Sequence, residues 1–217
     1  MAQWNSKILE KFFAPGITGF TEAEIPDLKE KHKEAEHWLP NHMLNSVFGG
    51  RYSDEVLPFA LNMMFRAQVA FKSYHTARDA TLEYLKDNKP DNPKIRIYFK
   101  AISEWETCLL NLQIFMDLGN NFDVKLRAFD KNDGSPFCRA YTLANIIKHW
   151  GGSIKDNKHS DKTIPVWLTN KGFSAHNTVL NFSELAELID VVAEQANGLQ
   201  NPVTPAKEAE ALKSAQA

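Results

Sequence analysis

The sequence predicts an all-α protein, an antiparallel helical bundle with a short irregular or hairpin insertion near residues 160–180. Two long stretches, 53–86 and 93–118, carry large apolar residues at alternating spacings of three and four, which is the period of an amphipathic helix. The Asn- and Pro-rich stretch 88–93 joins them, and so short a connection makes consecutive helices antiparallel neighbours. The one strand-like run, 164–169, contains Pro165, which confines it to an edge or an extended segment. Any sheet should therefore be a short hairpin at most.

The composition is that of an ordinary globular domain. The 217 residues are 43% hydrophobic and 24% charged, and the formal net charge of −2 gives no overall basic signal for nucleic acid or membrane. We predict three regions: short N-terminal helices packing on the bundle (1–50), the bundle core (51–200) and a disordered or loosely helical tail (201–217). Cys108 and Cys138 lie in predicted helices without metal-type spacing, so we expect reduced side chains.

The N-terminus shows no signal-peptide pattern, and no apolar run approaches the roughly 20 residues that span a bilayer. We therefore expect a cytoplasmic protein that does not interact with membranes.

The N-terminal region begins with an apolar face near residues 4–13. The charged stretch Pro26–Leu39 follows and predicts a solvent-exposed helix. Gly49 and Gly50 then break the chain.

The central helix begins near Ser53, a plausible cap, with Pro58 in its first turn. Large apolar residues on one side and alanines on the other predict a helix that is buried on two faces. Three polar residues, Gln68, His75 and Arg78, interrupt the apolar seam. We interpret them as a hydrogen-bonded layer that fixes the register between helices.

Three helices follow. The helix at 93–118 has Asn92 as its cap and Gly119 as its stop. The helix at 135–150 begins at Ser135 or Asp133 and ends at Gly151. The last helix, 183–197, presents one apolar face and ends at Asn197 and Gly198.

The candidate site lies at the end of the 135–150 helix. Tyr141, Asn145 and His149 are spaced four residues apart, so they share one face of a helix. An imidazole one turn from a carboxamide can transfer a proton, and the neighbouring Lys148 can hold a phosphate. The alternative is that His149 is the polar end of an amphipathic helix, where a cation interacts favourably with the helix dipole.

The segment Asn145–His149 resembles the Asn-x-x-x-His part of the motif of the HEPN superfamily (higher eukaryotes and prokaryotes nucleotide-binding). The resemblance implies a small helical bundle, in many members a metal-independent ribonuclease of a toxin–antitoxin or antiviral system. It assigns His149 as the acid/base group and Asn145 as the group that orients the substrate or the histidine. The family places an arginine just before the asparagine, but this chain has Ala144 there.

The region around this site is locally basic. Residues 134–176 contain six Lys and Arg residues, among them Arg139, Lys148 and Lys155, against two Asp residues, and such a patch attracts phosphate-bearing ligands. With Tyr141, Arg139 and Lys148 are the candidate substrate-binding residues. The alternative is that the patch faces the acidic last helix and is neutralised there.

Two functional classes remain open at this stage. One is a HEPN-like module that binds RNA or a protein partner, catalytically degenerate, in a defence or toxin–antitoxin context. The other is an active ribonuclease that uses His149, and a purely structural helical protein is a further alternative. We expect a homo-oligomer, because the two-faced central helix and aromatic residues such as Trp4 and Trp167 suggest more apolar surface than one chain buries.

We predict no cofactor and no metal. Glu34 and His37 have the spacing of a di-iron ligand pair, but no second copy exists.

Overall fold

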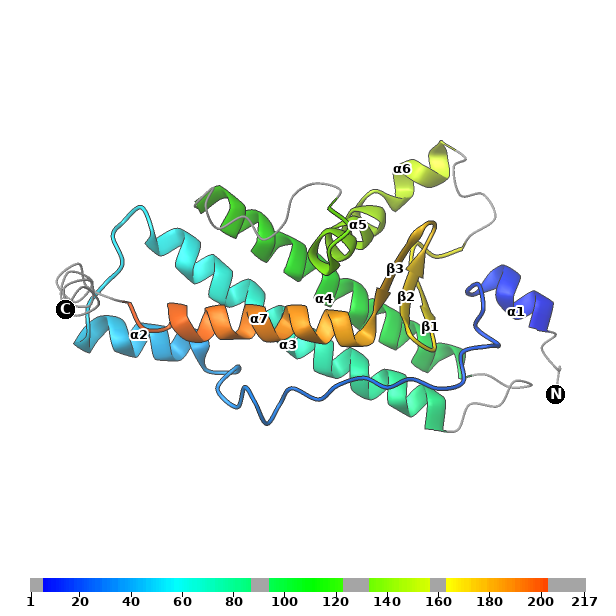
Figure 1. Cartoon of the computed structure of the whole chain (residues 1–217), viewed down its shortest axis with the longest axis horizontal. Coiled ribbons are helices and arrows are strands. Elements are labelled where there is room, and N and C mark those ends of the chain that lie inside the picture. Colours follow the sequence, from blue (N-terminus) through cyan, green and yellow to red (C-terminus); the bar gives the residue numbers. More distant parts are fainter. Residues whose placement is uncertain (1–5, 87–93, 123–132, 157–162, 203–217) are drawn as a thin grey trace.

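A computed structural model describes residues 6–86, 94–122, 133–156 and 163–202, and these ranges contain seven helices and three strands (Figure 1). The protein is predominantly helical, as predicted. The finer expectation of an all-α fold needs correction, because three strands form a small antiparallel sheet. The tail, residues 203–217, lies outside the described residues.

The centre of the fold is a hairpin of two long helices, α3 (Leu57–Lys86) and α4 (Ile95–Phe122), which pack along each other (Figure 1). Buried alanines of α3 allow the close approach: Ala60, Ala67, Ala70, Ala77 and Ala80. The Ser53 carbonyl accepts the Leu57 N–H at the start of α3, and Pro58 lies in its first turn, as expected. The helix α4 continues past the predicted stop at Gly119, while its predicted start at Asn92 lies outside the described residues.

Two further helices pack on this hairpin. The helix α5 (Pro136–Lys148) contacts α4, and α7 (Phe182–Leu199) contacts α3. The Ser135 side chain caps α5 by accepting the Cys138 N–H at 3.1 Å, as the sequence predicts. The predicted stop at Gly151 is wrong: α5 ends at Lys148, and a short helix, α6 (Trp150–Lys155), begins directly after His149.

The sheet is a meander of β1 (Trp167–Thr169), β2 (Gly172–Ala175) and β3 (Thr178–Asn181), in the order β1-β2-β3. The expectation of a hairpin at most is therefore wrong. The register pairs Leu168 with Phe173 and Phe173 with Leu180, and all three are buried. The Phe173 ring of β2 packs against Trp105 of α4 with their centroids 5.0 Å apart, so the sheet is anchored to the helical core through its middle strand.

The N-terminal region consists of α1 (Ser6–Phe12), α2 (Trp38–Phe48) and, between them, residues 13–37, which we name the strap. The strap crosses the molecule alongside α3 and α7 (Figure 1). The predicted helix over Pro26–Leu39 is wrong, because residues 26–37 form no α-helix and α2 begins only at Trp38. The strap buries Ile17, Phe20 and Ile25, and this irregular spacing suits an extended segment better than a helix.

All of these elements except α6 contribute to one hydrophobic core. Its largest fully buried side chains come from the strap, α2, α3, α4, the sheet and α7, and include Phe20, Trp38, Tyr74, Trp105 and Phe173. The strap and α2 are therefore part of the packing that holds the bundle together.

Candidate functional site

The structure separates the predicted site residues into an anchored group and an exposed group. Asn145 and Tyr141 face α4: Gln113 donates to the Asn145 Oδ1 at 2.7 Å, and the Tyr141 hydroxyl donates to Asp117 at 2.9 Å. Burial and the hydrogen bond to Asp117 raise the pKa of Tyr141. Both side chains thus hold α5 against α4, and neither is hydrogen-bonded to His149.

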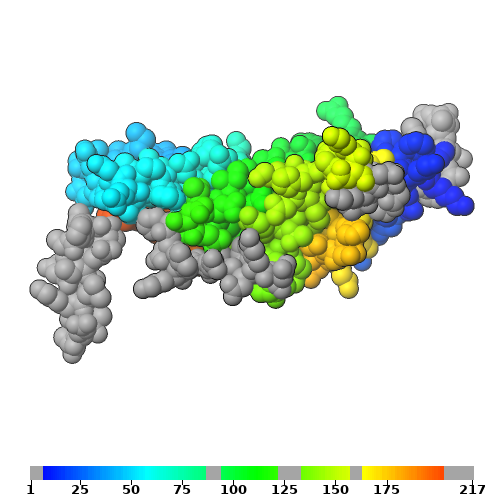
Figure 2. Space-filling model, turned by 90° about the horizontal axis from the view of Figure 1, so that it is seen from above, coloured from blue at the N-terminus to red at the C-terminus, as the bar shows by residue number. Residues whose placement is uncertain are grey.

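His149 lies at the junction of α5 and α6 and is exposed, as is Lys148 beside it. Its backbone N–H donates to the Asn145 carbonyl and closes the last turn of α5. Within the described ranges, no acidic side chain forms an ion pair with His149 or Lys148. This placement matches the alternative of a polar helix end, and it also leaves both groups accessible to a ligand (Figure 2 shows α5 and α6 on one exposed face).

Arg139 and Ala144 occupy structural positions. The Arg139 guanidinium binds Glu184 at the start of α7 and donates to the Gly134 carbonyl. Glu184 in turn accepts the Asn181 N–H at 2.9 Å in a capping box. The Ala144 methyl is fully buried, so this position lies in the core of the chain.

The acidic face of α7 is neutralised mainly by the strap. Lys31 binds Asp190 at 2.6 Å and Glu194 at 3.1 Å, and His32 binds Asp190 at 2.7 Å. Burial would raise the pKa of Asp190, but the hydrogen bonds from Lys31 and His32 hold it below its usual value. The expected alternative, in which the acidic last helix neutralises the basic region 134–176, is realised at Glu184, which binds Arg139, but not at Asp190 and Glu194, which bind the strap.

The tautomer of His32 follows from its neighbours. The Trp38 indole N–H can only donate, and it does so to the Asn197 Oδ1. The Asn197 amide nitrogen must then donate to the His32 Nδ1, 3.4 Å away, so the proton of the neutral ring is on Nε2 and points at Asp190. Both ring nitrogens of His32 therefore form hydrogen bonds with α7, and they join the strap to that helix.

The hydrogen-bonded layer predicted on α3 is realised only in part: Gln68 and Arg78 form hydrogen bonds, but with the strap rather than with another helix. Arg78 donates to the Ile25 carbonyl at 3.0 Å, and Gln68 donates to the Glu36 carbonyl at 3.2 Å. His75 lies between them, 4% exposed, and its Nδ1 is 3.7 Å from Asp27. Burial lowers the pKa of His75 to about 4, against the attraction of Asp27.

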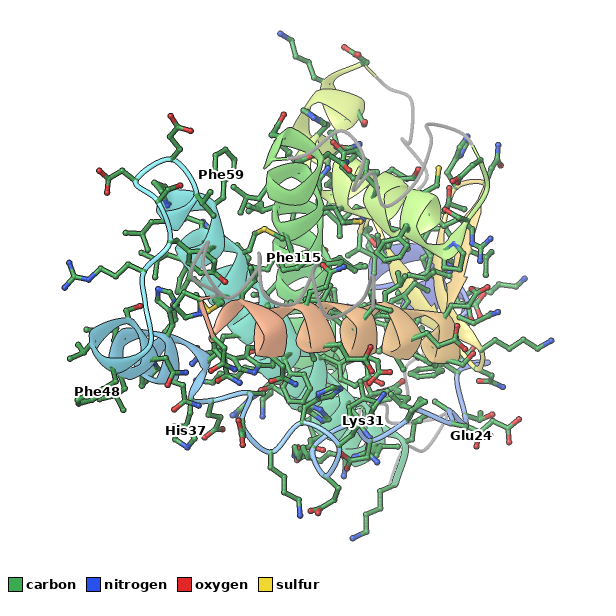
Figure 3. The ribbon with its side chains drawn as sticks, turned by 60° about the vertical axis from the view of Figure 1, so that its left-hand side comes forward. Glu24, Lys31, His37, Phe48, Phe59 and Phe115 are labelled. Atoms are coloured by element: carbon green, nitrogen blue, oxygen red, sulfur yellow. The ribbon has the colours of Figure 1, made fainter. Side chains whose placement is uncertain are left out.

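An apolar face on α2 was not predicted from the sequence. Four large side chains at spacings of one and four residues are exposed: Met43 by 69%, Leu44 by 60%, Val47 by 69% and Phe48 by 87%. Figure 3 shows Phe48 pointing away from the body of the molecule. The opposite side of α2 buries Trp38 and His42, and the helix contains no Lys, Arg, Asp or Glu. The i, i+1, i+4, i+5 spacing was the available signal, but sequence alone could not say which side of this short helix faces the core.

Two searches of the described residues bear on other functions. No group of three or more His, Cys, Asp or Glu side chains there is arranged to hold a metal ion. None of the helices in those ranges combines the length and the apolarity needed to cross a bilayer.

No family model, curated protein or solved structure matches this chain.

Proposed function

We propose that this protein is a HEPN-like binding module that holds RNA on the exposed surface of α5 and α6 without cleaving it. The observation that carries the proposal is the positive charge at that surface, which no ion pair among the described residues neutralises. Lys148 and Lys155 are exposed and have no ion pair among the described residues. The carboxylates of Asp190 and Glu194 on α7 are bound by Lys31 of the strap. Uncompensated lysines on one surface attract a polyanion independently of its sequence.

The arrangement of the other motif residues argues against catalysis by a single chain. Catalysis in the family uses an arginine beside the asparagine, and here that position is the buried Ala144. The Asn145 Oδ1 accepts from Gln113, and this hydrogen bond holds the Asn145 side chain against α4. His149 can contact a phosphate, but among the residues that the structure describes no side chain pairs with it to complete an acid/base pair.

The test is to incubate a labelled single-stranded RNA with the protein and with His149→Ala in the presence of EDTA. We expect intact RNA with both proteins and affinities within about threefold of each other, since Lys148 and Lys155 remain. The melting temperatures should agree within about 2 °C, because His149 is exposed. Metal-independent cleavage by the protein and its loss in His149→Ala would instead identify a ribonuclease.

The second candidate function is self-association through α2, and its specific observation is the exposed apolar face of Met43, Leu44, Val47 and Phe48. Together these side chains expose on the order of 500 Å², at the upper end of what a monomer tolerates. A two-fold pairing of this face would bury about 1,000 Å² in total, the lower limit for a specific interface. We therefore propose a weak homodimer, to be measured by light scattering at tens of micromolar.

A cytoplasmic location and a defence or toxin–antitoxin context belong to the same proposal. They are tested by fractionating the cells that express the chain and by inspecting the genes beside its own, since toxin and antitoxin genes are normally paired.

A further inference from the structure

One end of the molecule gathers positive charge from two segments that lie far apart in the sequence. The helix α1 and the first turns of α4 both lie at this end (Figure 1). The ring of Phe13, directly after α1, packs against Phe99 of α4 with the two centroids 6.2 Å apart, and this contact holds α1 beside α4. We name this region the basic end, after its five cations: Lys7, Lys11, Lys94, Arg96 and Lys100.

A groove of about 430 Å³ lies at the start of α4. Three cations, one carboxylate and two isoleucines line it: Lys94, Arg96, Lys100, Glu83, Ile95 and Ile97. Arg96 and Lys100 are exposed, and neither forms an ion pair with a residue that the structure describes. Because they are four residues apart, they share one face of α4, and both are available to an anionic ligand.

The carboxylates near this groove do not neutralise it. Glu83 lines the groove, and Glu104 follows Lys100 by one helical turn, but within the described ranges neither carboxylate is ion-paired with Arg96 or Lys100. Even with Glu10, Glu83 and Glu104 all counted against its five cations, the basic end keeps an excess of two positive charges. A local excess attracts polyanions although the whole chain carries a net charge of −2.

The helix α1 adds an exposed aromatic ring to the basic end. Phe12 is 60% exposed, and the Lys11 ammonium lies 5.7 Å from the centroid of its ring. The same helix buries Leu9 completely, and the Thr163 hydroxyl donates to the Phe13 carbonyl at 2.8 Å, so α1 is fixed to the body of the protein. A fixed ring with a cation beside it offers a nucleic-acid base a face on which to stack and its phosphate group a positive charge.

The basic end lies within reach of the α5–α6 surface. Lys155 ends α6, and Thr163, eight residues later, is bound to the Phe13 carbonyl at the end of α1. Eight residues span at most about 29 Å, which limits the distance between Lys155 and Phe13. Sites for single strands cover up to about 16 nucleotides per domain, so one strand can contact both surfaces.

We propose that the basic end is a second RNA contact that favours single strands, with phosphate groups at Arg96 and Lys100 and a base stacked on Phe12. The inference rests on the proposed function, because the strand is the one that α5 and α6 hold. Stacking needs a base whose face is free, and in a duplex the neighbouring base pairs cover each face. Neither a stacking ring nor a side-chain cation recognises the 2′-hydroxyl group, so the basic end should accept RNA and single-stranded DNA alike.

The test is a fluorescence anisotropy titration of the full chain with a labelled oligouridine of about 20 nucleotides at low salt. Arg96→Ala/Lys100→Ala should bind about tenfold more weakly, and its salt dependence should fall by the equivalent of about one to two phosphate contacts. Phe12→Ala should bind about fivefold more weakly with an unchanged salt dependence, because it removes a stacking ring and no charge. The melting temperatures of both variants should stay within about 2 °C of the parent's, since all three side chains are exposed.

Two matched controls remove the same types of side chain elsewhere. Arg51→Ala/Lys72→Ala removes one exposed arginine and one exposed lysine outside the basic end. Phe65→Ala removes a phenylalanine of α3 that is 44% exposed. Both controls should bind the oligouridine within about twofold of the parent.

A labelled duplex RNA of the same length separates stacking from charge. Phe12→Ala should bind the duplex as the parent does, and an equal loss with duplex and single strand would contradict the stacking role. If both basic-end variants bind the single strand within about twofold of the parent, the inference is overturned and RNA binding at α5 and α6 is untouched. Losses confined to the basic-end variants, with Lys148→Ala/Lys155→Ala binding like the parent, would contradict the proposed function instead.

Discussion

His75 should make the stability of this protein depend on pH between about 4 and 6.5. Its pKa is about 4 in the folded chain and 6.5 in the unfolded chain. Within that window the unfolded chain binds more protons than the folded one, so the free energy of unfolding decreases as the pH falls. Above pH 6.5 the imidazole is neutral in both states and the penalty is absent.

The size of the effect follows from the two pKa values. The full difference corresponds to about 3 kcal/mol, and roughly 2 kcal/mol of it should be lost between pH 7.5 and pH 5. Desolvation is the dominant cause and outweighs the attraction of Asp27, while Lys29 and Arg78 act in the same direction as desolvation.

The assay is urea unfolding of the parent and His75→Phe at pH 7.5, 6.5, 5.5 and 5. The variant should lack the loss of stability attributed to His75. The free energy of unfolding of the variant minus that of the parent should therefore increase by about 2 kcal/mol as the pH falls from 7.5 to 5. His42, whose pKa burial also lowers, remains in both proteins and cancels. The pKa values of Asp27 and Asp190 are lowered from 3.8, so their contributions are lost only below this range. A constant difference between the two proteins would refute the reasoning.

Three further predictions concern separate parts of the fold. Gly172→Ala should cost more than about 3 kcal/mol, because its Cβ would lie 2.1 Å from a backbone oxygen of β3, whereas Gly151→Ala on the open surface of α6 should stabilise the protein by up to about 1 kcal/mol; urea unfolding measures both. Asn145→Ala should cost about 1–3 kcal/mol by leaving Gln113 without its acceptor, and RNA binding should decrease no more than the folded fraction does. Val47→Asp should abolish the dimer that we propose, as measured by light scattering, and change stability by less than about 0.5 kcal/mol, since Val47 is 69% exposed; a dimer that persists in the variant would place the interface elsewhere.

The helices that could be predicted from sequence are those with long apolar periodicity. The α3–α4 hairpin, the cap at Ser135 and the course of α7 all followed from spacing and end residues. The ends were less predictable, because Gly151 and Gly198 are accommodated within helices. Glycine allows a helix to stop, but it does so only where the rest of the chain supplies a competing contact.

The strap and the third strand could not be predicted because tertiary contacts define them. The charges of residues 29–36 read as a solvent-exposed helix, yet Lys31 and His32 are bound to Asp190, far away in sequence. Phe173 and Leu180 show no long alternating pattern. They pair across β2 and β3, and the Phe173 ring packs on Trp105.

For the candidate site, the sequence could predict which residues lie together on one helix but not which residues they contact. The sequence placed Tyr141, Asn145 and His149 on one face of a helix, but it could not show that α4 offers Asp117 and Gln113 to the first two. The polar residues of the α3 seam did signal a layer of hydrogen bonds. The strap could not be predicted as the partner of these residues, because it accepts their hydrogen bonds through backbone carbonyl groups, which every residue type has.

The most direct test of RNA binding at α5 and α6 is a fluorescence anisotropy titration of labelled single-stranded RNA with the double variant Lys148→Ala/Lys155→Ala. The matched control is Lys72→Ala/Lys86→Ala, which removes two exposed lysines from α3. We predict that the first variant binds at least about tenfold more weakly at low salt and that its dependence on salt falls by the equivalent of about one to two phosphate contacts. The control should bind like the parent protein. Equal losses in the two double variants, or an affinity of the parent that does not change with salt, would contradict the proposed function.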